Sequence, residues 1–287
     1  MKKFLENNLM IEPNTLAPIV IFVFNRLEHT KKTLEALKNN TLAKESDLVI
    51  YSDAAKKTED KKKVNQVRKY LKNLSGFKRI QIINRKNNYG LAKSIKHGIK
   101  EIINKYGKII VLEDDIETGK YFLTYMNQCL KIFYKNKEIW HINGWNYPKN
   151  QNNNDSDIIF DSIMNCWGWA TWRDRWRGIN FNSKKLIKKF DLNMIYKINL
   201  ENHENFYSQL LANHYKLIDT WAIFWMISIF INNGICVRPK YSLTKNIGLD
   251  NSGIHCSKAL INYYNNQNIL DIYYKNYMMI LLYYLNY

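Results

Sequence analysis

The chain has 287 residues, of which 46% are hydrophobic and 24% are charged. This composition excludes an intrinsically disordered protein and suffices for one large domain with a buried core. A formal net charge of +18 favours an anionic partner, such as nucleic acid, an anionic membrane surface or a phosphorylated small molecule. No stretch has the ~18 uninterrupted apolar residues of a membrane-spanning helix, and the four cysteines form no Cys-x-x-Cys pair. We therefore expect a cytoplasmic protein with reduced thiols, at most peripheral on the inner face of the cytoplasmic membrane.

Short apolar runs alternate with segments of helical periodicity in the first part of the chain. The runs at 19–24, 47–51, 79–83 and 108–112 have the length and the β-branched content of buried strands. Apolar residues at spacings of three and four lie between and after these runs, as in amphipathic helices. The alternation predicts an α/β fold with a mostly parallel central sheet and flanking helices.

Polar residues follow each of these four runs. The fourth run ends in Glu113-Asp114-Asp115, and the other three are followed by Asn25-Arg26, Ser52-Asp53 and the segment 87–90. Ligands of parallel α/β sheets bind at the carboxyl ends of the strands, so we expect these residues to meet in one crevice. Three adjacent carboxylates repel one another unless a positive charge lies among them. Mn²⁺ or Mg²⁺ would supply that charge and a partner for phosphate; an acidic turn that caps the next helix is the alternative.

The character of the sequence changes in its second half. All eight tryptophans lie between Trp140 and Trp225, and four of them belong to the segment CWGWATWRDRW at 166–176. We expect a polar loop at 149–157 and short strands at 138–143 and 235–237. These strands would extend the same sheet.

Taken in order, the segments FNR, YSD, NYGLAKSI, VLEDD, CWGWATW, DTW and RP resemble the metal-dependent GT-A glycosyltransferases. The chain looks closest to the N-acetylglucosaminyltransferase I type branch and to related bacterial surface-glycan sugar transferases, from about residue 18 to 256. The resemblance implies a GT-A, Rossmann-like fold, a single domain with two abutting halves. Residues 1–17 would be a lead-in, and residues 18–146 the nucleotide-sugar-binding half. Residues 147–256 would form the acceptor-binding and catalytic half, and residues 257–287 a Tyr-rich tail.

The resemblance implies a function for each matching position. Residues expected to contact the nucleotide sugar are Arg26, Asp53, Asn88, Gly90, Lys93, Glu113, Asp114 and Arg238. Of these, Asp53 matches the acid that reads the uracil ring, since a carboxylate can accept the ring N–H. Asp115, just past the fourth strand, would bind Mn²⁺ or Mg²⁺ directly, and His255 of the late loop GLDNSGIHC could bind the metal or a phosphate. Helix capping is the alternative for the strand-end residues, and a structural role is the alternative for His255.

Catalysis needs a base that takes the proton of the acceptor hydroxyl. Asp219 in IDTWAIFW matches the acid of the family's Trp-Asp segment, although Ile218 stands where tryptophan is usual. Capping of the helix that follows is the alternative for Asp219. Asp174 is a second candidate, but three neighbouring arginines make a structural ion pair the simpler interpretation. Direct displacement with Asp219 as base would invert the anomeric centre.

Three tryptophans could stack on a sugar or frame the acceptor pocket, namely Trp145, Trp167 and Trp169, with core packing as the alternative. The expected activity is transfer of a hexose or N-acetylhexosamine from a nucleotide sugar, a UDP-sugar, to a glycan or lipid-linked acceptor. The acceptor would be a hydroxyl of a surface glycan such as lipopolysaccharide or capsule.

Two other classes of protein fit part of the sequence. A sugar-phosphate nucleotidyltransferase predicts a glycine-rich phosphate loop after the first strand, where this chain has NRLEHT. A non-catalytic nucleic-acid-binding protein predicts a recognisable binding module, and the sequence contains none, so we expect no nucleic acid partner. Residues 61–100 carry thirteen Lys or Arg and no Asp or Glu, and the tail holds eight of the twenty tyrosines. Both segments could contact an anionic membrane surface.

Overall fold

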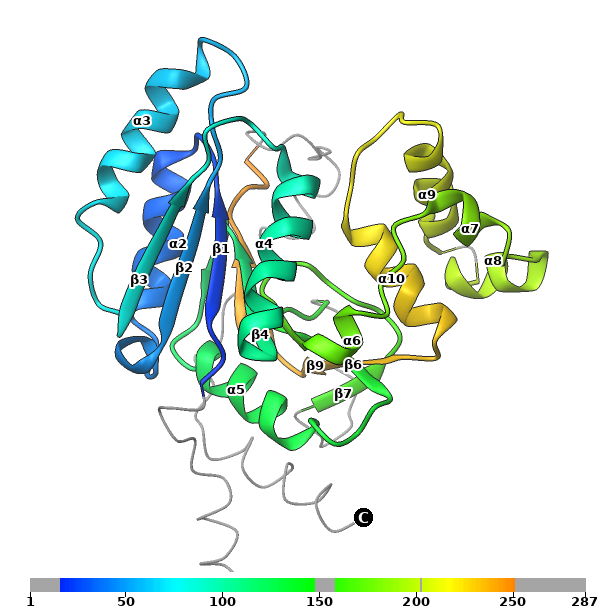
Figure 1. Ribbon diagram of the computed structural model, residues 1–287. Coiled ribbons are helices and arrows are strands. Elements are labelled where there is room, and N and C mark those ends of the chain that lie inside the picture. Colours follow the sequence, from blue (N-terminus) through cyan, green and yellow to red (C-terminus); the bar gives the residue numbers. More distant parts are fainter. Residues whose placement is uncertain (1–15, 148–157, 202, 251–287) are drawn as a thin grey trace, which may run out of the picture.

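The computed structural model describes residues 16–147, 158–201 and 203–250 (Figure 1). The predicted lead-in, apart from its last two residues, the loop at 149–157, His255 and the Tyr-rich tail lie outside the described residues. Within the described part of the chain, no helix has the length and apolarity needed to cross a lipid bilayer.

The four predicted strands of the first half form one parallel block. They are β1 (Ile19–Val23), β2 (Asp47–Ser52), β3 (Arg79–Asn84) and β4 (Lys108–Glu113), and β1 lies between β2 and β4. β1, and nearly all of β2 and β4, are buried, as expected for strands that are covered on both faces of a sheet. The predicted α/β fold with a mostly parallel sheet is confirmed.

Four further strands extend the sheet to eight, in the order β3-β2-β1-β4-β8-β6-β9-β7. β8 (Trp169–Trp172) is antiparallel to β4 and to β6 (Ile139–Asn143), and β6 is parallel to β9 (Ile235–Pro239). β6 and β9 therefore run in the direction of β4. The edge strand β7 (Ile158–Asp161) pairs antiparallel with β9. β6 and β9 match the predicted strands, whereas β7 and the strand character of WATW in β8 were not predicted.

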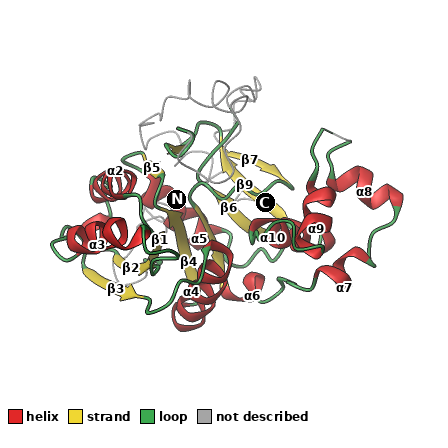
Figure 2. Cartoon of the chain, turned by 90° about the horizontal axis from the view of Figure 1, so that it is seen from above, coloured by secondary structure: helices red, strands yellow, loops and turns green. Residues whose placement is uncertain are grey.

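Helices cover both faces of this sheet (Figure 2). One face packs against α2 (Leu27–Lys38), α3 (Asp60–Leu71) and α5 (Phe122–Ile132), and the other against α4 (Leu91–Tyr106), α6 (Arg173–Trp176) and α10 (Ala222–Ile231). The approach of α4 is close at Gly98, because a Cβ there would lie 2.7 Å from the Phe22 ring and 2.8 Å from the Tyr51 ring. α4 is thereby fixed against β1 and β2.

A helical lobe, residues 181–231, projects beside the sheet (Figure 1). It consists of α7 (Ser183–Ile187), α8 (Leu192–Ile198), α9 (Phe206–His214) and α10. α7, α9 and α10 share a small core centred on Leu186, Leu210, Phe224 and Ile227, and α8 packs against α9. The lobe was not predicted from the sequence, because helices of five to nine residues are too short to show a clear hydrophobic period. The remaining elements are a 3₁₀ turn η2 (Ala43–Glu45) and an antiparallel pair of β5 (Ile116–Thr118) and β10 (Thr244–Asn246).

Candidate active site

The strand ends of the first half meet at one edge of the sheet, as the sequence predicts. The register places Val23 beside Ser52, Ser52 beside Asn84, and Phe22 beside Glu113. The polar residues that follow each strand therefore lie next to one another along the carboxyl edge of the sheet. Each strand ends there because its apolar run stops and a turn with its own hydrogen-bonding side chains begins.

Arg26 is the positive charge that faces the carboxylates at the end of β4. Its Nη2 donates to Asp114 Oδ1 and, over 2.8 Å, to Asp115 Oδ2, and its Nε lies 3.4 Å from Asp114 Oδ2. The side chains are 22%, 7% and 14% exposed for Arg26, Asp114 and Asp115. The guanidinium thus joins the ends of β1 and β4 and relieves the repulsion between two of the three acids.

Glu113 lies in the same cluster and has no basic side chain bound to it among the described residues. Burial, together with the negative charges of Asp115 and Asp114, raises the pKa of Glu113 to about 8. Burial also raises the pKa of Asp114, although Arg26 opposes that effect. Glu113 therefore holds its proton to a higher pH than an ordinary glutamate does.

Asp115 is the acid of the cluster best placed for a metal ion. Its Oδ2 accepts from Arg26, and no hydrogen bond to its Oδ1 is present within residues 16–147, 158–201 and 203–250. Carboxylate oxygen suits Mn²⁺ and Mg²⁺. The described residues contain no group of three or more His, Cys, Asp or Glu side chains arranged around a common metal position. The open Oδ1 of Asp115 could serve as one ligand of such a cation.

The segment after β10 lies directly against this acidic cluster. The Ile247 N–H donates to the Asp115 carbonyl over 2.8 Å, and Asp250 forms an ion pair with His29 at 3.1 Å. A Cβ on Gly248 would lie 2.2 Å from Asp115 Oδ2 and 3.0 Å from Arg26 Nη1. Gly248 was missed in the sequence, although its place in a glycine-bearing loop was a signal. Only glycine lets this backbone approach the carboxylate so closely.

Asp53 builds a turn at the same edge. Its carboxylate accepts the N–H groups of Ala54, Tyr89 and Gly90, each at 2.9 Å, and the side-chain amide of Asn88 at 3.2 Å. Gly90 has φ +70 and precedes the first turn of α4. The predicted uracil contact of Asp53 would have to compete with these four donors, so its placement favours a turn-organising role. The sequence did not indicate this role, because the partners lie about 35 residues away.

Basic side chains surround Tyr89 beside this turn. The Arg85 guanidinium lies 4.1 Å and the Lys93 ammonium 4.5 Å from the centre of the Tyr89 ring, and the His97 ring meets it edge-on at 5.8 Å. Lys93 was predicted from the sequence to neutralise phosphate, whereas Arg85 was not singled out. Together with the N-terminus of α4, these cations form a region of positive potential next to the acidic cluster.

Arg238 occupies a different environment from the one predicted. It is 3% exposed and pairs with Asp161 at 2.5 Å, and its Nη2 also donates to the Ile163 carbonyl over 3.2 Å. β8 and β6 separate its strand β9 from β4 in the sheet. Arg238 is thus not brought together with the acidic cluster, and its contacts are those of a buried structural ion pair.

The predicted tryptophans lie mostly in the core. Trp169 is 0% exposed, and its ring stacks on Trp221 at 5.3 Å and on His141 at 5.2 Å. Trp145 is 1% exposed and meets Trp167, which is half-buried, edge-on at 4.7 Å. This burial favours the core-packing alternative for Trp145 and Trp169 and leaves Trp167 as the accessible member of the set.

Asp219 lies on the loop that leads into α10 and is exposed. The loop is braced because Asn213 accepts the Thr220 N–H and donates to the Thr220 hydroxyl, each at 3.0 Å. Trp221 occupies the N-cap position of α10 and makes no side-chain capping bond, so Asp219 does not cap the helix. Asp174, the second candidate base, pairs with Arg175 and Lys137, each at 2.8 Å, as the structural interpretation predicts.

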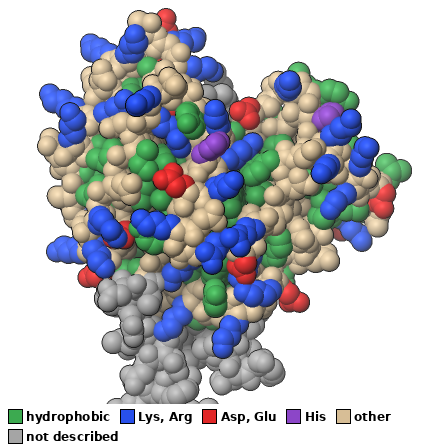
Figure 3. Space-filling view, viewed as in Figure 1, with side chains coloured by type: hydrophobic (Ala, Val, Ile, Leu, Met, Phe, Trp, Pro, Cys, Tyr) green, Lys and Arg blue, Asp and Glu red, His purple; other side chains and the backbone are tan. Residues whose placement is uncertain are grey.

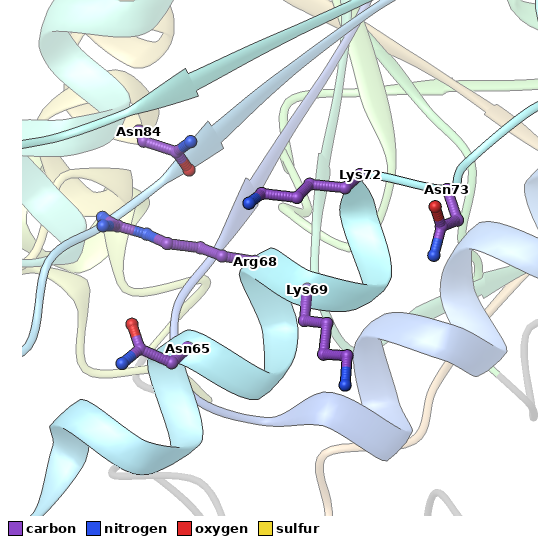
Figure 4. A pocket seen from close by; sticks show the side chains of 6 residues that line it. All are labelled: Asn65, Arg68, Lys69, Lys72, Asn73 and Asn84. Atoms are coloured by element: carbon purple, nitrogen blue, oxygen red, sulfur yellow. The ribbon is translucent and has the colours of Figure 1, made fainter.

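A groove of about 660 Å³ lies elsewhere, along α3 and β3 (Figure 4). It is lined by basic and carboxamide side chains from the helix and the edge strand, Asn65, Arg68, Lys69, Lys72, Asn73 and Asn84. Arg68 donates from its Nη2 to the Ser52, Asp53 and Arg85 carbonyls and so ties the ends of β2 and β3 together. The groove lacks acids and is not lined by any residue of the acidic cluster.

The chain is similar to several known proteins. The model of the GNT-I family matches residues 5–185. The mannosyltransferase PcManGT from Pyrobaculum calidifontis, solved with GDP-Man and Mn²⁺, is 10% identical over 80% of this chain and 74% of its own, with a TM-score of 0.40. TarS 1–349 from S. aureus is 11% identical over 94% and 71%, with a TM-score of 0.43, and the galactosyltransferase LgtC is 12% identical over 74% and 70%, with a TM-score of 0.35. No curated protein matches the chain.

Proposed function

This chain belongs to the GNT-I family and is a glycosyltransferase, and from that premise we propose that it moves a sugar from a UDP-sugar to a hydroxyl of a surface glycan. The acceptor would be lipopolysaccharide, capsule or a related lipid-linked glycan, and the reaction would depend on Mn²⁺ or Mg²⁺ and invert the anomeric centre. The observation that carries this proposal is the acidic cluster at the end of β4, faced by Arg26 from the end of β1.

The donor would lie along the carboxyl edge of β1 to β4. Asp115 would hold the cation, which when bound neutralises the charge that develops on the leaving diphosphate. The exposed ammonium of Lys93 and the N-terminus of α4 would attract the phosphates. Glu113 would form a hydrogen bond with the sugar or the ribose, and Asp114 would orient Arg26.

The acceptor would approach from the side of the helical lobe. Asp219 is exposed there and makes no hydrogen bond within the described residues, so its carboxylate is open to an acceptor hydroxyl. As general base it would take the hydroxyl proton while the oxygen attacks the anomeric carbon from the face opposite the diphosphate. A single displacement of this kind inverts the anomeric centre and needs no nucleophilic carboxylate of the enzyme. The family match ends at residue 185, so this assignment rests on the residues themselves.

The proposal extends to the membrane. The lysines of α3 and of the segment before it are exposed, and Figure 3 shows Lys and Arg side chains spread over the visible face with few acids among them. A surface of this charge would attract anionic lipid and so bring the enzyme to a lipid-linked acceptor.

One experiment tests the donor and the metal together. We expect the midpoint of thermal unfolding to rise when a UDP-sugar and Mn²⁺ are both present, because a ligand that binds only the folded state stabilises it. Neither the nucleotide sugar alone nor Mn²⁺ alone should give the same rise. UDP-, GDP- and CMP-sugars, each with and without Mn²⁺, form the screen. If no nucleotide changes the midpoint, the proposal is wrong, and a response to a GDP-sugar instead would reassign the donor.

A further inference from the structure

Lys96 of α4 links the nucleotide-binding half to the helical lobe. Its ammonium lies 4.5 Å from the centre of the Phe181 ring and 5.3 Å from that of Phe224. Phe181 precedes α7 and Phe224 lies on α10, and the two rings are in contact at 5.7 Å. A cation over aromatic faces is attracted by the negative charge of the rings. Figure 3 shows the molecule hollowed between the lobe and the body that carries the sheet.

The loop that carries Asp219 leads into α10, the helix that presents Phe224 to this ammonium. Burial lowers the pKa of Lys96, and the negative charge of Asp219 opposes that effect. Asp219 is therefore near enough for its charge to act on Lys96.

α4 holds Lys96 in a defined position relative to the nucleotide edge. The helix begins just after Gly90, whose N–H is bound by Asp53, and it packs against β1 and β2 at Gly98, where no Cβ fits. Lys96 lies between these two points, each of which is fixed to the sheet. The lobe, by contrast, meets the sheet through α10 and the aromatic side chains around it. Lys96 thus extends from a helix that is fixed to the sheet and contacts the lobe that carries Asp219.

We propose that Lys96 is a positioning residue that holds the lobe, and Asp219 with it, at a fixed distance from the nucleotide site. This inference rests on the proposed function, in which Asp219 is the base. The ammonium acts on Asp219 through its charge and on the lobe through Phe181 and Phe224. Displacement of a catalytic group by as little as ~1 Å can lower the rate about 100-fold. The donor contacts proposed above do not include Lys96.

The test compares Lys96→Met, Lys96→Arg and, as a matched control, Lys100→Met. Lys100 lies one turn further along α4 and is exposed, and within the described residues it forms no ion pair and no cation–π contact. We expect Lys96→Met to lower kcat about 10- to 100-fold with little change in the KM of the donor. Lys96→Arg, which keeps the charge and its contact with the rings, should restore most of kcat, and Lys100→Met should match the wild type.

A second measurement needs no turnover. In hydrogen exchange without substrate, we expect Lys96→Met to exchange faster than the wild type at 181–183 and 218–224, with unchanged exchange in β1 and β4. A wild-type kcat in Lys96→Met would overturn the inference. A lower kcat together with a lower free energy of global unfolding would also overturn it, because the loss of activity would then follow from a less stable fold. The assignment of Asp219 as the base is tested separately with the Asp219→Asn variant. Wild-type turnover of that variant would overturn the proposed base, whatever Lys96→Met shows.

Discussion

Two arginine–aspartate pairs lie at the ends of strands in the same sheet, and they differ in what surrounds them. Arg26 faces Asp114 and Asp115 and stays 22% exposed, whereas Arg238 is 3% exposed and faces Asp161. The first pair has more acid than base and an open side. In the second pair one arginine faces one aspartate, and the arginine also donates to the Ile163 carbonyl. A surplus of acid beside a partly exposed arginine indicates a binding site, while a one-to-one pair with a buried arginine indicates structure.

The same contrast holds for the other polar residues at this edge. In the second half, His141 accepts the Trp225 indole N–H at its Nδ1, and its Nε2 meets Asn143 and the Asn165 carbonyl. These contacts assign the Nε2–H tautomer and give both ring nitrogens a hydrogen-bond partner. In the first half, Lys93 is exposed, and Asp115 keeps one oxygen open. The open groups therefore gather beside β4, and the closed ones beside β6 and β9.

Asp115→Ala should have the largest effect, since it removes the open carboxylate of the first pair. We expect the rate of sugar transfer to fall at least about 10³-fold, because a group aimed at developing charge is lost, while the free energy of unfolding changes little. Steady-state transfer assays and urea denaturation measure the two quantities. Glu117→Ala, two residues along in β5, is the control and should retain activity. Wild-type transfer by Asp115→Ala would place this pair in the same class as Arg238–Asp161.

Arg238→Met should instead act on stability. Removal of the arginine leaves Asp161, whose side chain is 26% exposed, without its partner, and we expect the free energy of unfolding to fall by about 1–3 kcal/mol. Urea denaturation measures this loss, and Arg238→Met with Asp161→Leu should recover part of it, because no buried charge then remains. The affinity of the folded protein for the nucleotide sugar should be unchanged. Weaker donor binding with unaltered stability would return Arg238 to its predicted contact with the diphosphate.

Gly248→Ala tests whether the open side of the first pair depends on close backbone approach. The added methyl would lie 2.2 Å from Asp115 Oδ2, so the segment must move and weaken the bond from Ile247 to the Asp115 carbonyl. We expect about tenfold weaker binding of donor and metal, which corresponds to the loss of about one hydrogen bond. Calorimetric titration measures the affinity. Asp250→Ala, in the same segment but paired with His29, serves as the control and should leave the affinity nearly unaltered.

The effect that is smallest over any one pH unit is a dependence of stability on pH, which arises in the hydrogen-bonded network around His141. Burial lowers the pKa of His141 to about 3, against 6.5 as its ordinary value. Between those values the unfolded chain binds a proton that the folded chain does not, so acidification favours unfolding. From pH 6.5 down towards 3, the loss through His141 is at most about 1.4 kcal/mol per pH unit. Urea denaturation at several pH values should give a shallower slope for His141→Gln, and equal slopes would contradict a neutral, buried His141.

The first half of the fold and its strand ends could be predicted because their signals are local. Apolar runs of five or six residues, each followed by Arg26, Asp53 or Asp115, carry both the strand and its end in one short segment. The environments of Arg238 and Asp53 could not be predicted in this way. Asp161 lies 77 positions before Arg238, and Asp53 binds a turn about 35 residues away. Distant contacts of this kind depend on the sheet order, which periodicity does not encode.

The second half gave weaker local signals. WATW in β8 is buried on all sides, so its tryptophans suggested a pocket as readily as a core. The short helices of the lobe have too few turns to show a period, and Lys96 looked like any solvated lysine of a basic helix. In each case the deciding information is which other segment covers the side chain, and that is settled only by tertiary packing.

The position of β8 has a consequence for how the chain acquires its fold. β4 lies in the middle of the finished sheet, yet its neighbour on one side is formed by residues 169–172, which are synthesised more than fifty residues later. Until β8 arrives, β4 is an edge strand with the apolar sequence IIVL and unpaired backbone groups. A nascent chain that pauses in this interval presents a surface ready to pair with another copy. Insertion of β8 is therefore the step that pairs the open side of β4 and removes this aggregation-prone edge.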